Sequence, residues 1–515
     1  GYYDVKVLSE IVELQEDYQA EITFNINAGT RYKINRIKTN IDPVLNKNLF
    51  LPLDSIYNKV VGSYYSPFLV KNLLDEVDLI ISSEDLQFIE HNVNEVINND
   101  NIEVIVNIFE GQKTTVNKIQ VLGNTITNET VIRGELLLDE GDPYSQVRVD
   151  KSISKLKSRQ LFGSVKEEVS DGDVPNTKNI KINVEEMPTG EISAGAGIGT
   201  NGGSFAFLIK ENNWLGKGIS VSANADVSQD TIKGSLSFVE KNYNFTGKDL
   251  RYNFENVKND KPDSGYENST IGAGVGISYE RFKDIYFAPG VKLTIDDLKT
   301  NETASKLLKK QSGSSSDLMF DYSLFTDKRD RSFMPTSGYF TSFYQELPIY
   351  AEDVYVKNSF SSSMYKEFSE NMIGALKFSA SAVNGLQDDD VKISKRLFLS
   401  TNRLRGFESG KVGPKDGLDY IGGNYTTIVN LEANFPNFFP EKSNAEIGLF
   451  LDAGNVWGVD YTDTIDDSNK LRSTVGLNTS WLSPAGPISF IFSHNLSKAS
   501  SDKDQSFNFR LGTTF

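Results

Sequence analysis

Hydrophobic and polar residues alternate strictly along the last eleven residues of the chain, from Gln505 to Phe515. In a β-strand successive side chains point to opposite faces, and each residue advances the chain by about 3.3 Å. Eleven residues therefore make one tilted crossing of a membrane, with one face toward lipid and the other toward a polar interior. The pattern predicts the closing strand of a transmembrane β-barrel. The residues expected to face lipid are Phe507, Phe509, Leu511, Thr513 and Phe515.

Short alternating segments also fill most of the chain after Pro188. From Glu191 onward they divide into sixteen strands, an even number as in closed bacterial barrels. Seven of the connections are short and rich in aromatic and turn residues, and eight are long or polar. The sequence therefore predicts a β-dominated fold in which residues 189–515 form a 16-stranded antiparallel transmembrane β-barrel. The long connections lie near residues 200–203, 228–231, 258–267, 298–315, 346–353, 384–423, 453–470 and 497–504.

Before Pro188 the chain contains an internal repeat of roughly 80 residues. Each unit has an entry strand, a turn with the pattern Gly-x-x-Tyr-Ser, an amphipathic helix and an alternating exit strand. This order is typical of a small α+β module with a helical layer on a three-stranded sheet. The entry strands are expected at 32–37 and 115–121, the helices at 68–81 and 147–161, and the exit strands at 22–29, 104–111 and 180–186.

The repeat gives the expected domain boundaries. Residues 30–111 and 112–188 each form one module, and residues 1–29 hold only the last two strands of another. We therefore expect the natural protein to carry more such modules upstream.

Composition narrows the class of protein. The formal net charge of −17 argues against a nucleic-acid binder, because such proteins need a basic surface. No run of about 18 apolar residues occurs, so no transmembrane helix is predicted. The chain has no cysteine, and it begins with glycine rather than methionine, so the lack of a visible signal peptide carries no information.

Two carboxylates are expected inside the predicted barrel. In the twelfth and thirteenth strands, Glu432 and Asp452 fall on the face opposite to the apolar residues, and Phe450 shares the face of Asp452. A poorly solvated pair of carboxylates favours a nearby cation. Arg405, in the long connection 384–423, can supply one if this loop folds inward, because its guanidinium group matches carboxylate geometry.

These residues, with several others, resemble the BamA family of outer-membrane assembly factors, and the N-terminal repeats resemble its POTRA modules. The resemblance implies that Arg405 lies inside the barrel and binds Asp452, with Glu432 and Phe450 lining the same site. Two departures are visible. Leu404 replaces a valine that is usual before Arg-Gly-Phe, and two modules and a fragment replace the usual five. The matching segments are Arg405-Gly406-Phe407, Gly422–Asn424, Leu431-Glu432, Phe450–Trp457, the turns 213–216 and 330–338, and the terminal strand.

No residues indicate catalysis or cofactor binding. Gly197–Gly202 matches Gly-x-Gly-x-x-Gly, but a strand rather than a helix follows, so a turn is expected. His91 and His494 have no partner motif for a metal, and Asp388–Asp390 is interpreted as an exposed charged loop. We predict that the protein is not an enzyme and has no cofactor or metal.

The first barrel strand, 191–200, carries Gly195, Gly197 and Gly199 and should pair weakly with the last strand. Two weakly paired strands can separate toward the lipid, and the first strand then offers an unpaired edge to a client strand. In this interpretation Ala196 faces a residue near Phe509.

The expected function is therefore insertion of other β-barrel proteins into the bacterial outer membrane. The modules lie in the periplasm, where they receive unfolded outer-membrane proteins. The resemblance also implies that outer-membrane lipoprotein subunits of an assembly complex are partners. The lipid bilayer is a further expected partner, and nucleic acid is not expected to bind. The alternative is a two-partner-secretion pore that exports cargo through the lumen; it would have two modules and a plug helix, and a beginning within a module argues against it. A diffusion porin would lack the periplasmic repeats.

Overall fold

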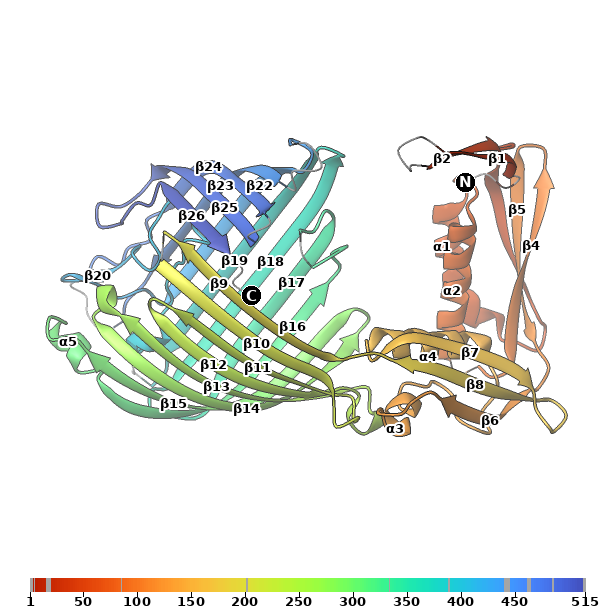
Figure 1. Cartoon of the computed structure of the whole chain (residues 1–515), viewed down its shortest axis with the longest axis horizontal. Coiled ribbons are helices and arrows are strands. Elements are labelled where there is room, and N and C mark those ends of the chain that lie inside the picture. Colours follow the sequence, from red (N-terminus) through yellow and green to blue (C-terminus); the bar gives the residue numbers. More distant parts are fainter. Residues whose placement is uncertain are drawn as a thin grey trace. The chain divides into compact units, whose positions relative to one another are not determined.

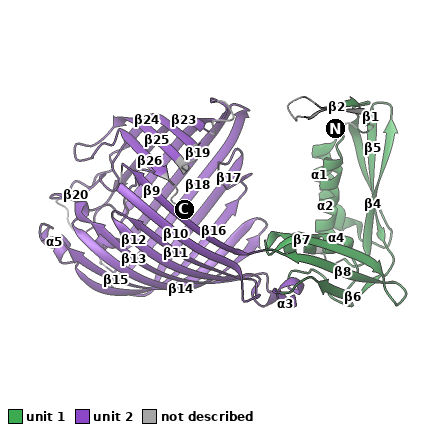
Figure 2. Ribbon diagram, viewed as in Figure 1, with its two compact units in different colours: residues 1–125, 135–187 green, residues 126–134, 188–515 purple. Residues whose placement is uncertain are grey.

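The computed structural model contains two compact units (Figure 2). One unit comprises residues 1–125 and 135–187, and the other comprises residues 126–134 and 188–515. None of the described helices has the length and apolar character needed to cross a membrane. The described residues are 3, 5–14, 20–84, 86–200, 202–332, 334–387, 390–439, 445–460, 465–483 and 486–512.

The first unit begins with an antiparallel pair of strands, β1 (Lys6–Leu14) and β2 (Ala20–Asn27). These strands lie in the region 1–29 that the sequence predicts to hold only two strands of a module.

The first complete module has three strands and a helical layer (Figure 1). The central strand, β5, pairs in parallel with β3 and antiparallel with β4. Every second residue of β5 is apolar, and Ile102, Val104, Val106 and Ile108 are almost completely buried against the helices. Alternation thus gives this sheet one face for the core. The elements are β3 (Lys33–Ile41), η1 (Lys47–Phe50), α1 (Pro52–Val60), α2 (Pro67–Ser83), β4 (Ile89–Asn98) and β5 (Asn101–Glu110).

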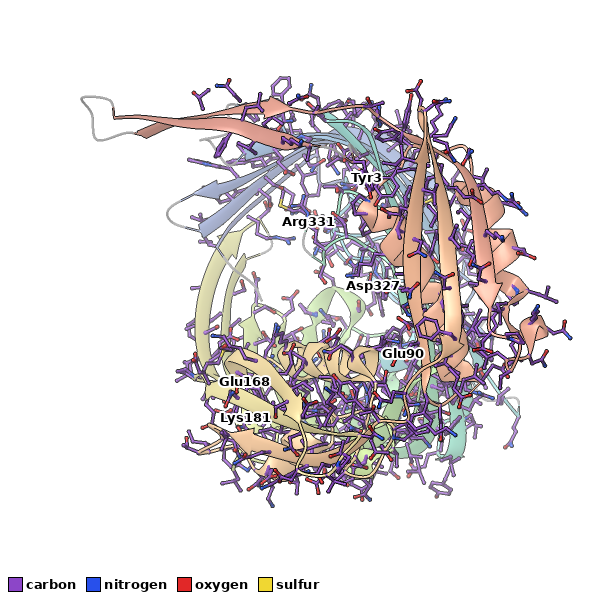
Figure 3. All side chains as sticks on the ribbon, turned by 90° about the vertical axis from the view of Figure 1, so that its right-hand side faces the viewer. Tyr3, Glu90, Glu168, Lys181, Asp327 and Arg331 are labelled. Carbon is purple, nitrogen blue, oxygen red and sulfur yellow. The ribbon has the colours of Figure 1, made fainter. Side chains whose placement is uncertain are left out.

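The second module repeats this arrangement, with the sheet order β6-β8-β7. Ile153 and Leu156 of its long helix are buried, as are Ile180 and Ile182 of the central strand. On the exposed face, Glu168 of β7 lies beside Lys181 of β8, with 3.5 Å between Oε2 and Nζ (Figure 3). The elements are β6 (Thr115–Leu122), α4 (Gln146–Ser158), β7 (Phe162–Asp171) and β8 (Thr177–Glu186).

The short helix α3 (Glu129–Arg133) lies in residues 126–134, which belong to the compact unit of the barrel. The Asn128 backbone N–H donates a 2.8 Å hydrogen bond to the Gly216 carbonyl. Asn213 Nδ2 donates to the buried Thr127 hydroxyl at 2.9 Å. This segment therefore packs on the turn between the second and third barrel strands.

The second unit contains a closed barrel of sixteen antiparallel strands, which confirms the predicted fold class. Each barrel strand pairs with the next along the chain, and the first strand, β9, pairs with both β10 and the last strand, β26. The strands are β9 (Gly190–Gly199), β10 (Gly202–Trp214), β11 (Ile219–Ser228), β12 (Thr231–Glu240), β13 (Asp249–Lys261), β14 (Tyr266–Phe282), β15 (Ile285–Thr300), β16 (Gly313–Asp327), β17 (Gly338–Ala351), β18 (Tyr355–Ser369), β19 (Met372–Gly385), β22 (Tyr425–Phe435), β23 (Ala445–Trp457), β24 (Arg472–Ser483), β25 (Gly486–Ser497) and β26 (Phe507–Gly512).

Period-two alternation gives the barrel an apolar outer face and a polar inner face. On β23, Leu449 and Leu451 are 48% and 40% exposed, whereas the side chain of Asp452 is completely buried. The outward residues are the surface that a bilayer would cover, so their exposure is expected of a barrel of this kind.

The longest connection joins β19 to β22, and we call residues 386–424 the lumenal loop because its side chains reach the inner wall. Apolar residues of this loop pack in a buried cluster with residues of the barrel. Ile393 and Ile421 of the loop, for example, share this cluster with Tyr266 of β14. The loop contains η4 (Ile393–Lys395), β20 (Lys415–Asp416) and β21 (Asp419–Tyr420). Other connections contain η2 (Tyr243–Phe245), η3 (Pro262–Ser264) and α5 (Lys306–Lys309).

Candidate functional site: the lumenal loop and the seam

Arg405 of the lumenal loop binds Asp452 on β23 through two parallel hydrogen bonds. Nε donates to Oδ2 at 2.7 Å, and Nη2 donates to Oδ1 at 2.6 Å. The Arg405 backbone N–H donates a third hydrogen bond to Oδ2 at 3.1 Å. This two-pronged geometry matches the guanidinium fork to both carboxylate oxygens, which makes the contact both strong and directional.

Glu432 and Phe450 complete the surroundings of Arg405. Arg405 Nη2 lies 2.9 Å from Glu432 Oε1, and the guanidinium carbon lies 3.8 Å from the centre of the Phe450 ring. Glu432 also accepts a 2.8 Å hydrogen bond from Lys377 on β19. Two cations thus balance two carboxylates, of which Asp452 is completely buried and Glu432 largely so.

The residues after Arg405 explain why the loop can approach the wall so closely. Gly406 has a φ of +90°, and a Cβ there would lie 2.4 Å from Asn495 Oδ1, so only glycine fits without displacement. Phe407 is 1% exposed and packs with a small apolar cluster that anchors the loop. The other members of this cluster are Leu399, Leu404, Val412, Ile428 and Val456.

Burial determines what this arrangement does. Removing one partner of a buried ion pair costs about 3–5 kcal/mol, because the remaining charge is left without compensation. The pair therefore holds the loop in one position on the barrel wall.

Two features of this region were missing from the sequence interpretation. Lys377 points inward on β19, and strand parity could have identified it as the second cation. A further buried pair joins Arg472 of β24 to Asp502, with 2.9 Å between Nε and Oδ2. Asp502 lies in a connection where no periodicity exists, so no sequence signal indicated that pair.

The seam is the pairing of β9 with β26. Among the described residues the seam contains three aligned residue pairs, whereas β9 and β10 are aligned at ten. Phe507, Phe509 and Leu511 follow the predicted outward parity. Thr513 and Phe515 were predicted to continue this face, but they lie outside the described residues. The three pairs of the seam are Arg510 with Gly199, Leu511 with Ile198 and Gly512 with Gly197.

The register of the seam corrects one expectation. The Thr200 backbone N–H donates to the Phe509 carbonyl at 3.0 Å, so Thr200 rather than Ala196 lies beside Phe509. Strand parity located the outer face correctly, but it contains no information about the shift along the strand axis. The three glycines lie on the inner face of β9, where Gly195 is buried and Gly197 and Gly199 are half-buried.

The fold and this site together define a class: a membrane barrel with POTRA modules before it and a loop bound to its inner wall. The Omp85 superfamily domain matches residues 213–515, and a POTRA family described as a surface antigen variable number repeat matches residues 114–187. Since the first match covers more than half of the chain, the chain belongs to the Omp85 superfamily. This confirms the resemblance inferred from the motifs. Assembly factors of this family are not enzymes, and neither is this protein.

Relatives with similar sequences are outer membrane protein assembly factors named BamA. The chain is 25% identical to BamA of Neorickettsia risticii and to BamA of Neisseria meningitidis. Both alignments cover 100% of this chain, and they cover 70% and 71% of the relatives.

Solved structures support the fold. BamA from Haemophilus ducreyi lacking POTRA domains 1–3 is 22% identical, with a TM-score of 0.69 over 94% of this chain and 100% of that chain. CdiB from Acinetobacter baumannii is 12% identical, with a TM-score of 0.54 over 95% of this chain and 91% of that chain.

Proposed function

We propose that this protein inserts other β-barrel proteins into the bacterial outer membrane and that the seam between β9 and β26 is the place where client strands enter. A client strand would pair with the edge that an open seam presents, because an unpaired edge offers a complete row of backbone donors and acceptors. The protein would thus act as a template for the pairing of client strands rather than as a channel through which clients pass.

The observation that carries this proposal is the pairing of β26 with β9, which spans three aligned positions in the part of the chain that the structure describes. On its other side, the described part of β26 has five aligned pairs with β25 and two aromatic contacts across that pair. The rings of Phe490 and Phe509 are 5.4 Å apart, and those of Phe492 and Phe507 are 5.1 Å apart. These differences favour opening at the seam over opening on the other side of β26.

The N-terminal modules fit a receiving role in the periplasm. In each three-stranded sheet an outer strand, β4 or β7, pairs with the central strand on one side only. An extended segment of an unfolded client, or of a lipoprotein subunit of an assembly complex, can add to such an edge. Localisation of the barrel in the outer membrane and of the modules in the periplasm is part of this proposal.

A crosslink across the seam tests the proposal. The chain has no cysteine, so Ile198→Cys with Leu511→Cys places the only two thiols at aligned positions. We expect the oxidised full-length protein to remain folded in lipid vesicles but to stop inserting clients, and reduction should restore insertion. Normal client insertion by a completely crosslinked protein would rule out the seam as the place where client strands enter.

A matched pair of isoleucines provides the control. Ile192 on β9 and Ile209 on β10 are aligned and both face outward. Cysteines at these positions join two strands that are already well paired, so this crosslink should leave insertion unchanged.

The alternative function is a translocation pore of the two-partner-secretion type, which would need a free lumen. The lumenal loop, with Arg405 bound to Asp452, argues against an open passage. In a pore, the seam crosslink would leave export of the cargo unaffected, so the same experiment distinguishes the two functions.

A further inference from the structure

The lumenal loop contacts the terminal strand from inside the barrel. Arg510 Nη2 on β26 donates a 2.5 Å hydrogen bond to Asn402 Oδ1 of the loop. The Gln505 backbone N–H donates to the Gly406 carbonyl at 2.9 Å, and Asn495 Nδ2 on β25 donates to the same carbonyl at 3.0 Å. The loop therefore binds β26, its neighbour β25 and the segment that leads into β26.

Backbone contacts extend this interaction along the loop. Phe407 forms a β-bridge with Asp504. The Glu408 N–H donates to the Lys503 carbonyl at 3.0 Å, and the Lys503 N–H donates to the Lys411 carbonyl at 3.1 Å. Residues 406–411 thus act as a short partner for residues 503–505, which lie directly before β26.

The other part of the loop is held by different strands of the barrel. Three cations in and beside η4 each pair with a carboxylate from a separate strand or connection, and their side chains are almost fully buried. The loop therefore connects β26 to a distant part of the wall. The pairs are Lys392 with Asp353, Lys395 with Asp317 and Arg396 with Asp460, at 3.0, 3.0 and 2.6 Å between nitrogen and oxygen.

We propose that Asn402 and Arg510 are positioning residues that hold β26 beside β9, so that the lumenal loop controls closure of the seam. The inference rests on the proposed function, because it assigns a control element to the same seam. Among the described residues β26 has three aligned pairs with β9, and its contacts with the lumenal loop lie at the same end of the strand. The guanidinium–amide contact and the backbone contacts of residues 503–505 hold β26 and the segment before it in addition to this pairing.

The rate of crosslinking across the seam measures its closure directly. In full-length protein carrying Ile198→Cys and Leu511→Cys in lipid vesicles, disulfide formation under a fixed oxidant reports how often the strands are aligned. Asn402→Ala should lower this rate about tenfold, as expected for loss of a hydrogen bond to a charged group. Asn402→Asp should restore the rate, because a carboxylate also accepts from Arg510.

A control separates this effect from a general change of the barrel wall. Arg251 on β13 lies on the strand face opposite to the exposed Tyr252, and β13 pairs with β12 and β14, so Arg251→Ala should leave the crosslinking rate unchanged. Rescue by Asn402→Asp shows that the Asn402→Ala variant lost a contact rather than its fold. Equal rates for Asn402→Ala and the parent would overturn the proposal.

Client insertion, measured on the same proteins, keeps the two proposals distinguishable. If Asn402→Ala slows crosslinking while the crosslinked parent still inserts clients, the positioning role stands and the insertion function fails. If crosslinking abolishes insertion but Asn402→Ala leaves the rate unaltered, the insertion function stands and the positioning role fails.

Discussion

Gly199 on β9 and Phe509 on β26 approach so closely that a Cβ on Gly199 would lie 2.4 Å from the Phe509 carbonyl oxygen. A real Cβ does not tolerate that distance, so one of the two strands would have to move. The glycine therefore has two effects at the seam. It removes side-chain contacts that would strengthen the pairing, and it also allows the strands to meet.

This relationship predicts that Gly199→Ala weakens the seam. The added methyl group forces a shift of the backbone, and such overpacking typically costs about 1–3 kcal/mol. In protein carrying Ile198→Cys and Leu511→Cys, the variant should form the seam disulfide more slowly than the parent. Gly234→Ala on β12 is the matched control, because nothing lies within 4 Å of a Cβ built there. Equal rates for all three proteins would show that the strands adjust without cost.

Arg405→Ala should detach the lumenal loop from the barrel wall. It leaves Asp452 buried without its partner, and loss of one member of a buried pair costs roughly 3–5 kcal/mol. We expect a lower unfolding temperature and faster proteolysis within residues 386–424.

Arg403→Ala provides the comparison for Arg405→Ala, since Arg403 lies in the same loop and its side chain is exposed. It should behave like the parent protein in both assays. Identical unfolding temperatures for the Arg405 and Arg403 variants would mean that the pair does not anchor the loop.

A charge on the outer face of β26 should damage assembly of the barrel itself. Phe509→Lys puts an ammonium group where the stacked ring of Phe490 and lipid are expected, at a cost of about 2–4 kcal/mol near the middle of the membrane. Asn508→Lys loses a 3.3 Å hydrogen bond to Gln505 but keeps its charge on the polar side, so its loss should be smaller. The measurement is the yield of folded protein in vesicles, and equal yields would contradict the assigned faces.

The sequence revealed the architecture because the relevant signals are local. Alternation marks each strand regardless of its neighbours, and the turn residues separate the strands, so the count of sixteen followed from the pattern. Parity also placed Glu432 and Asp452 on the inner face, since a side chain's direction depends only on its position in its own strand. Arg405 was a candidate cation because of its guanidinium group, and the resemblance to a known family implied that it lies inside the barrel and binds Asp452.

Relationships between distant segments were harder to predict. The register of Thr200 beside Phe509 depends on how far two strands slide along each other, and alternation fixes only which face a residue occupies. The contact between Asn402 and Arg510 joins residues that are 108 positions apart, through a loop without periodicity. Such contacts follow from the path of the loop inside the closed barrel, which no local pattern records.

The last prediction concerns closure of the lumen and follows from Arg396, which lies directly after η4. The Arg396 side chain is fully buried, binds Asp460 at 2.6 Å and donates from Nε to the Val391 carbonyl at 3.0 Å. Arg396→Ala removes both contacts and leaves the Asp460 carboxylate with the weaker donors Asn424 and the Val391 N–H.

The lumenal loop near Arg396 should then move away from the connection between β23 and β24, where Asp460 lies, and ions should pass more readily through the barrel. We therefore expect higher conductance in planar bilayers for Arg396→Ala than for the parent, with Arg403→Ala unchanged as the control. Arg396→Lys should fall between them, because an ammonium group retains the charge but cannot reproduce the planar fork. Parental conductance in Arg396→Ala, together with proteolysis showing that the loop has moved, would assign closure of the lumen to another segment.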